Sequence, residues 1–303
     1  MVIMVLVVTA TAGMVWQQSR AFRIEAAERA RAQAAWILTG ALDWARLILR
    51  KDQRSNRGEP HDSLDEPWAT PLAEARLSTF LAVDKDNNTE GAPEAFISGG
   101  ITDAQSHFNL AGLLDDAGKE VPAQRAALER LCSLVGTTSD TAARISQALV
   151  AARLGSADDG PRGQPLRPTR LADLAWAGID GATLTMLEPY VVLLPVATAV
   201  NVNTASREVL MAAIDGIDLG TAERLVQARQ RKAFTRVDDI KNELPSAVVL
   251  DGGRIGVSSS HFEVAGRLRL DDRVLEQRSL LVRREDRVDV LRSERRSFSA
   301  TGF

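Results

Sequence analysis

Cysteine and histidine are scarce in this 303-residue sequence, which contains one cysteine and three histidines. Cys132 cannot form a disulfide within the chain, and its apolar, helix-favouring neighbours (LERLCSLV) predict a buried thiol. His61, His107 and His261 are scattered and have no evident partner. The sequence also lacks a zinc-ligand spacing, a P-loop, a GxSxG elbow and a GxGxxG turn. We therefore predict that the protein is not an enzyme.

An excess of charge is also missing, because 37 basic residues face 40 acidic ones and the net charge is −3. A general affinity for nucleic acid or anionic lipid is therefore not implied. What the sequence does have is an uncharged run over residues 1–16, which continues without a proline to residue 50. Alanine, leucine, arginine and glutamate dominate residues 17–50, and all four favour helix. We predict one helix over residues 1–50, about 75 Å long at about 1.5 Å per residue.

The first part of this helix is predicted to enter a membrane. A spanning helix needs about 20 apolar residues, and residues 1–18 fall slightly short, as expected if the span begins upstream of this sequence. Two alternatives stay open: a cleaved signal with a small-x-small site at residues 10–12, and a plain signal anchor. The arginines that follow the run favour a cytoplasmic downstream side by the positive-inside rule. The predicted membrane and assembly residues are Val2, Ile3, Val5, Leu6, Val7, Val8, Met14, Val15 and Trp16.

Further along the helix, apolar residues recur every three or four positions, which predicts a packing face. We expect this face to pack on the protein's own sheet below the membrane. Alanines higher up form a small-residue stripe that permits close contact with sister helices. The residues of the lower face are Ile37, Ala41, Trp44, Ala45 and Ile48, and those of the upper stripe are Ala26, Ala27, Ala30 and Ala34.

Two polar segments follow the helix. The first, rich in proline, glycine and charge, is predicted to be a loop, and its acidic cluster Asp62, Asp65 and Glu66 lies beside an exposed-looking tryptophan, Trp68. Such a cluster normally has a packing or ligand role. In the second loop the alternating oxygen donors resemble the opening of a calcium site, although the glycine and glutamate of an EF-hand do not follow. The alternative is a solvated loop that binds no metal. Calcium is the only cofactor that the sequence suggests. The candidate ligands are Asp84, Asp86 and Asn88.

In the remaining chain the spacing of apolar residues changes twice, from a strand pattern to a helical one and back. Residues 95–103 are predicted to be a short strand broken by glycines, and residues 106–110 another strand. A helical region over 122–245 contains three units, each with a helix, a glycine turn and a capped helix, at Gly136, Gly178 and Gly216. Residues 258–270 and 274–284 then alternate as strands around a turn at 271–272, with a short final strand over 288–291. This order predicts an α+β fold with an all-helical insertion.

The helical region allows two interpretations. Residues 201–206 (NVNTAS) and the hairpin at Gly216 resemble helix-hairpin-helix DNA binders, in which hairpin amides bind a phosphate. Here the hairpin contains Asp218, whose carboxylate would repel a phosphate. Five basic residues favour DNA binding, but acidic residues lie among them; the basic set is Arg224, Arg229, Arg231, Lys232 and Arg236. A helical domain that packs on protein is favoured, and a membrane-anchored DNA-binding protein is the alternative.

The order of several short motifs points to one family. After the N-terminal helix come LDWARLIL at 42–49, DEPWA at 65–69, GITDAQ at 100–105, FNL at 108–110, NVNTA at 201–205, and strands after Ser258. In this order, over nearly the whole chain, the sequence resembles the K class of type II secretion minor pseudopilins.

The resemblance implies a pilin-like α+β fold: a long N-terminal helix and an antiparallel sheet, interrupted by a large all-α insertion of helix-turn-helix (SAM-like) units. The corresponding segments are a transmembrane and assembly helix over residues 1–50, a pilin-like domain over 51–110 and 247–303, a first helical (SAM-like) insertion over 111–200, and a second, helix-hairpin-helix-like insertion over 201–246.

The resemblance also implies a function, partners and a location. The protein would form the tip of the periplasmic pseudopilus, nucleate its assembly and help to export folded proteins across the outer membrane. Its partners would be the I- and J-class minor pseudopilins, inner-membrane assembly components and membrane lipid, with no nucleic acid. It would be a single-pass inner-membrane protein with its globular part in the periplasm, an orientation that the arginine count opposes.

The sequence departs from the family pattern in two places. The leader that ends in a glycine is absent, so we expect that the natural chain starts further upstream. An acidic Asp-Trp-x-Asp stretch is replaced by residues 146–153 (SQALVAAR), which puts calcium in the helical region in doubt. In addition, the first acidic residue is Glu25, beyond the apolar run. Ordinary pseudopilins carry a glutamate near the start of the helix, so its absence is expected of a subunit that caps the assembly; the alternative is that this glutamate lies upstream of the given sequence.

Overall fold

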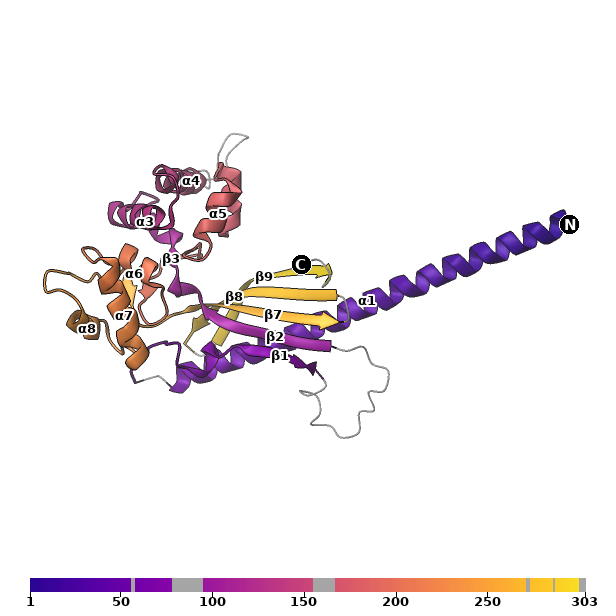
Figure 1. Cartoon of the computed structure of the whole chain (residues 1–303), viewed down its shortest axis with the longest axis horizontal. Helices are drawn as coiled ribbons and strands as arrows, with labels where there is room; N and C mark the ends of the chain where they lie inside the picture. The colour runs from indigo at the N-terminus through magenta and orange to yellow at the C-terminus, as the bar shows by residue number, and fades with distance from the viewer. Residues whose placement is uncertain (56–57, 78–94, 155–166, 271–272, 286, 300–303) are drawn as a thin grey trace.

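A computed structural model shows a long helix, a five-stranded antiparallel sheet and a helical body (Figure 1). The structure describes residues 1–55, 58–77, 95–154, 167–270, 273–285 and 287–299. The first half of helix α1 (Val2–Ser55) extends away from the rest of the chain, while its second half lies along the sheet (Figure 1). The helix begins where it was predicted and ends five residues later than predicted.

The second half of α1 buries one face against the sheet. Ala34 is the first buried residue, and Leu38, Leu42, Ala45 and Leu49 follow at intervals of three or four, the spacing that keeps side chains on one face of a helix. Of the predicted face, Ala45 is buried, and Ile37, Ala41 and Ile48 are partly buried and pack against the core clusters beside the buried leucines. The placement of Trp44 on this face was wrong, because that indole is 57% exposed.

The sheet has the order β1-β2-β7-β8-β9, and all its neighbouring strands are antiparallel. Strands β7 and β8 match the predicted pair closely, but the predicted last strand was too short, because β9 is 13 residues long. The predicted turn at 271–272 lies outside the described residues. The bounds are β1 (Leu72–Arg76), β2 (Ala95–Asp103), β7 (His261–Leu270), β8 (Arg273–Arg284) and β9 (Arg287–Ser299).

Glycines do not break β2, contrary to the prediction. The strand pairs with β7 without interruption, and Gly99 lies opposite Gly266. A Cβ atom at position 99 would lie 2.4 Å from the backbone oxygen of Ala265, so a side chain is excluded there. Glycine at this position therefore allows two strands to approach closely and does not end one of them.

We expect Gly99→Ala to lower the free energy of unfolding by about 1–3 kcal/mol, the usual cost of forcing extra volume into a packed site. Gly100→Ala is the matched control, because its Cβ would meet only Pro71, at 3.7 Å. Its effect should stay below about 1 kcal/mol, the span of strand propensities. Thermal unfolding followed by circular dichroism measures both. Equal melting temperatures for the two variants would contradict this account of Gly99.

The helical body contains the three predicted glycine turns. Gly136, Gly178 and Gly216 all have positive φ, between 78° and 82°, and they end or connect short helices as expected. Asp180 and Asp218 cap the helices that follow. The helices are α3 (Pro122–Val135), α4 (Thr141–Leu154), α5 (Gly181–Leu187), α6 (Arg207–Ala213), α7 (Leu219–Arg231) and α8 (Val237–Ile240). The 3₁₀ helices of this body are η4 (Leu171–Ala177) and η5 (Lys241–Glu243).

Two small parallel pairings connect the helical body to the sheet. Strand β3 (Phe108–Asn109) pairs with β4 (Val191–Val192), and β5 (Val200–Asn201) pairs with β6 (Ile255–Gly256). The predicted strand over 106–110 is therefore wrong beyond these two residues. Strand β3 is short because a 3₁₀ turn lies on each side of it, one capped by the Asp103 side chain and the other by the Asn109 side chain. The 3₁₀ turns outside the helical body are η1 (Pro67–Ala69), η2 (Ala104–Ser106) and η3 (Leu110–Leu113).

Candidate functional site

The predicted membrane residues lie on the free half of α1. This is the one helix, among the described residues, that is long and apolar enough to cross a membrane. Large apolar side chains are exposed all around its first turns, and burying them in lipid or against other helices would remove that area from water. Their role in a membrane or an assembly stays a prediction. Those described as exposed are Val2, Ile3, Val5, Val7, Val8, Met14, Val15 and Trp16.

A second exposed apolar surface lies on α1 where the helix crosses the sheet, on the side away from it. Trp36 is 77% exposed, Trp44 57% and Leu47 53%. Gly40 lies between the tryptophans, and a Cβ placed there would meet nothing within 4 Å. Large apolar groups around a glycine form a notch that a second helix can enter closely. We call Trp36, Gly40, Trp44 and Leu47 the α1 notch.

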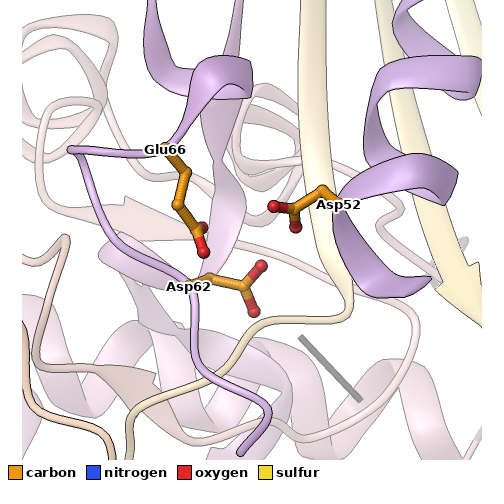
Figure 2. Close-up of side chains that lie close together, drawn as sticks. All are labelled: Asp52, Asp62 and Glu66. Carbon is orange, nitrogen blue, oxygen red and sulfur yellow. The ribbon is translucent and has the colours of Figure 1, made fainter. Parts of the chain in front are cut away.

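Below the notch, α1 ends at a buried cluster of charges. Asp52 lies in its last turn, and Asp62 and Glu66 come from the segment that follows; one oxygen of each lies within 4.8 Å of the others (Figure 2). Arg283 of β8 donates to Asp52 at 2.8 Å and to both oxygens of Asp62 at 2.6 and 2.7 Å. Its side chain is only 8% exposed and stacks over the ring of Phe262 at 4.8 Å.

A further carboxylate, Asp103, extends this cluster toward the helical body. It is fully enclosed and accepts hydrogen bonds from Thr204 and Ser259, both at 2.6 Å, and from Asn201 at 3.0 Å. Asn201 also donates to the backbone oxygen of Asp62. We call Asp52, Asp62, Glu66, Asp103 and Arg283 the acidic joint. It ties together the end of α1, the end of β2, the NVNTA segment, the residues just before β7 and the end of β8.

The acidic joint contains four carboxylates and one guanidinium, and burial sets its electrostatics. Loss of hydration raises the pKa of Asp52 from about 3.8 to about 6, although Arg283 opposes the shift. Burial raises the pKa of Asp103 to about 6 despite its hydrogen bonds, and it also raises the pKa of Asp62. Removing a carboxylate from water penalises its charged form, which is the cause in all three cases.

The spacing of Asp52, Asp62 and Glu66 would suit a cation, but at least one oxygen of each is already engaged. Arg283 lies against the two aspartates, and one Glu66 oxygen accepts from the Ser63 amide at 3.0 Å and from the Trp68 indole at 2.7 Å. The cluster is therefore an ion-pair and hydrogen-bond network. The predicted calcium ligands Asp84, Asp86 and Asn88 lie outside the described residues.

Of the two roles predicted for the acidic segment beside Trp68, packing or ligand binding, the structure shows a packing role. The indole looked exposed from the sequence but is buried. Trp68 is 1% exposed and meets Phe262 edge to face, with ring centroids 5.2 Å apart. The bond to Glu66 explains why an acidic residue precedes it in the sequence, since a buried indole N–H needs an acceptor. No sequence pattern marks Asp52, Asp103 and Arg283 as a site, because charged residues at a helix end and in strands resemble ordinary surface positions.

The raised pKa of Asp52 predicts a pH-dependent difference between the wild type and Asp52→Asn. A carboxyl group whose pKa is higher in the folded than in the unfolded protein stabilises the fold while it is protonated. For Asp52 this contribution is fully present below the unfolded pKa of about 3.8, and it is lost as pH rises through the folded pKa of about 6. Asparagine does not ionise, so the variant has no such pH-dependent loss at this position. We therefore expect the melting temperature of the variant, relative to wild type, to increase between pH 4 and pH 7.5. His107 and His261, whose pKa values are lowered by burial, are common to both proteins and cancel. A constant difference across this range would contradict the burial of a charged Asp52.

In the hairpin at Gly216, in the third helical unit, an aspartate side chain already engages one backbone amide. The Asp218 carboxylate accepts from the Thr221 amide at 2.8 Å and caps α7. Arg229, part of the basic set, points inward and donates to the backbone oxygens of Val202 and Ala205. A structural role therefore accounts for Arg229, one of the five basic residues that favoured DNA binding, and a capping role accounts for Asp218, the residue that opposes it.

A long N-terminal helix packs on an antiparallel sheet and carries an exposed apolar extension, which is the arrangement expected of a pilin-like fold. The solved GspK-GspI-GspJ complex from the enterotoxigenic Escherichia coli type 2 secretion system contains a chain of the same fold. It matches with a TM-score of 0.63 and 19% identity, over 89% of this chain and 98% of that chain.

Sequence comparisons also find similarity to known proteins. The family model for type II secretion system (T2SS) protein K matches residues 200–257. The type II secretion system protein K of Pseudomonas aeruginosa is 28% identical over 295 residues, which cover 90% of this chain and 83% of the relative. The resemblance to the K-class minor pseudopilins that the sequence predicted is confirmed. Protein K is a component of the secretion machinery and not a known enzyme.

Proposed function

We propose that this chain is the minor pseudopilin at the tip of a periplasmic type II secretion pseudopilus, where it nucleates assembly and helps to export folded proteins across the outer membrane. The observation that carries the proposal is α1. Apart from the half-buried Ala27 and Ala30, residues 2–33 have exposed side chains wherever these are described, and the second half of α1 carries the α1 notch. Both surfaces require a partner, because isolated soluble domains rarely expose such large apolar patches.

The partners we propose are the I- and J-class minor pseudopilins, together with inner-membrane assembly components and membrane lipid. The matched solved structure is a complex of three such proteins, which supports the choice. Within the membrane, the apolar turns of α1 would contact lipid and sister helices. Outside it, the α1 notch would receive an apolar ridge of a sister helix.

The location we propose is the inner membrane, crossed once, with the globular part in the periplasm. The arginines after the span oppose this orientation. Two of them are paired with acidic residues, Arg29 with Glu25 at 2.5 Å and Arg31 with Glu28 at 3.0 Å. Protease treatment of spheroplasts tests the orientation: the globular part should be digested from outside, and protection in intact spheroplasts would place it in the cytoplasm.

We also propose that the helical body is an insertion of SAM-like and helix-hairpin-helix-like units into the pilin-like fold. The repeated positive-φ glycines and aspartate caps support the repeat. The alternative of a DNA-binding function is not favoured, because Asp218 occupies the hairpin and Arg229 is turned inward.

The α1 notch is tested by purifying the full chain in detergent with candidate I- and J-class pseudopilins. We expect one copy of each subunit in the complex. Trp36→Ala or Gly40→Leu should weaken association about 30-fold or more, the effect of losing about 2 kcal/mol at an interface hot spot. Trp176→Ala is the matched control, because this tryptophan is 67% exposed on the helical body. A homopolymer, or equal assembly by all three variants, would contradict the proposal.

A further inference from the structure

Strand β9 forms one edge of the sheet, on the side opposite β1 (Figure 1). It pairs with β8 along its whole length, from Arg287 to Ser299. On its other side, no strand of the described chain lies next to it. An edge of this length offers a row of backbone donors and acceptors that another strand can pair with.

The last eight residues of β9 are the most suitable part of this edge. The only irregularity in the pairing of β8 with β9 falls between Leu280 and Leu281, so Arg292–Ser299 runs opposite Leu280–Arg273 without a break. The segment contains no proline. Proline, a bulge and a short length are common ways of blocking an edge, and none of them applies to these eight residues.

The charges along β9 are not balanced within the described structure. Asp289 is paired with Arg287 at 3.1 Å, and Glu294 is paired with Arg292 at 3.3 Å and with Arg170 of the helical body at 3.0 Å. Both acidic residues of the strand are therefore already engaged. Two adjacent exposed arginines, Arg295 and Arg296, are left without a carboxylate partner among the described residues.

The two arginines point to opposite faces of the sheet, because consecutive strand residues alternate. Arg295 lies on the face that packs on α1, where it donates to Gln277 at 2.7 Å and to Thr39 at 3.3 Å. Both partners are neutral. Arg296 lies on the other face, in register with Glu276, whose carboxylate is bound by Arg278 at 2.7 Å. A strand added to β9 would therefore meet a positive charge on each of its faces.

We propose that the edge of β9 binds an extended segment of another protein as an added strand, and that this segment carries two consecutive acidic residues opposite Arg295 and Arg296. Cross-strand pairs of opposite charge stabilise a sheet, and like charges destabilise it. The same two arginines disfavour pairing of β9 with a second copy of itself. This inference goes beyond the proposed tip function, since it concerns the sheet edge and not α1.

The test uses the full chain in detergent and three synthetic ten-residue peptides of alternating threonine and valine. One peptide has a central Glu-Glu pair, the second has Lys-Lys, and the third has Glu-Glu with alternate backbone nitrogens methylated. We expect saturable binding of the first peptide only, with slowed amide hydrogen exchange in β9. Methylation and charge reversal should each weaken binding at least 10-fold.

The Arg296→Glu variant should no longer bind the acidic peptide and should bind the Lys-Lys peptide instead. Arg231→Glu is the matched control, because it makes the same charge change at an exposed position of α7 in the helical body, and it should bind like wild type. Equal binding of the methylated peptide, protection outside β9, or no binding at all would overturn the proposal. Self-association with β9 protection in the absence of peptide would also overturn it, in favour of pairing between copies. None of these outcomes depends on assembly through the α1 notch.

Discussion

Replacing Arg283 by methionine is expected to lower the free energy of unfolding by about 3–5 kcal/mol, the usual cost of removing one partner of a buried ion pair. Arg283 is the only cation of the acidic joint, and it contacts Asp52, Asp62 and the backbone oxygen of Ser259. Without it, buried carboxylates face one another with no compensating charge. Methionine preserves much of the volume, so the loss is mainly electrostatic.

The pH dependence of this variant separates charge from packing. Protonation of the carboxylates relieves their repulsion, so Arg283→Met should recover part of its melting temperature as pH falls from 7.5 to 5. The control is Arg284→Met, the exposed neighbour at the end of β8, which should change stability by less than about 0.5 kcal/mol. A loss in Arg283→Met that is the same at both pH values would show that the residue acts through packing alone.

Replacing Trp68 by alanine is expected to cost about 3–5 kcal/mol, the range for truncating a large buried aromatic. The indole fills the space between α1 and the sheet, where it touches Phe262 and belongs to the same core cluster as Leu49 and Leu281. Its removal leaves a cavity and deprives Glu66 of a donor. We expect a large fall in the melting temperature, measured by circular dichroism or differential scanning calorimetry.

Two further variants separate the parts of this effect. Trp68→Phe keeps most of the ring volume but removes the 2.7 Å bond to Glu66, so it should cost about 1.5–3 kcal/mol, the value of a hydrogen bond to a charged group. Trp176→Ala removes an exposed tryptophan and should change stability little. Equal losses for Trp68→Phe and Trp68→Ala would mean that the hydrogen bond, and not the packing, accounts for the stability.

Local patterns predicted much of this fold because they depend on neighbours in the sequence. The helix over α1, the strands β7 and β8, and the glycine turns at Gly136, Gly178 and Gly216 all follow from periodicity and capping residues. Errors arose where distant residues decide the outcome. Gly99 continues a strand because another glycine faces it in β7, and the last strand is long because β8 offers a partner along its whole length.

The acidic joint was beyond prediction for the same reason. Asp52 and Arg283 are separated by 231 residues, and only the tertiary fold brings them to 2.8 Å. The sequence did indicate the neighbourhood of Trp68, because an acidic cluster beside a tryptophan is unusual. It did not distinguish the exposed indoles of Trp36 and Trp44 from the buried one, since the helical phase of α1 is set by the leucines Leu38, Leu42 and Leu49.

The way α1 is attached to the sheet determines how the protein would respond to a mechanical load. The buried contacts from Ala34 to Leu49 extend over about 22 Å of helix at about 1.5 Å per residue, and the acidic joint fastens the end of the helix just beyond them. A force along the helix axis shears all these contacts at once, whereas a sideways force peels them one after another. The globular part is therefore held most strongly against pushing or pulling along α1, the direction in which a growing filament would push this protein in its proposed tip role.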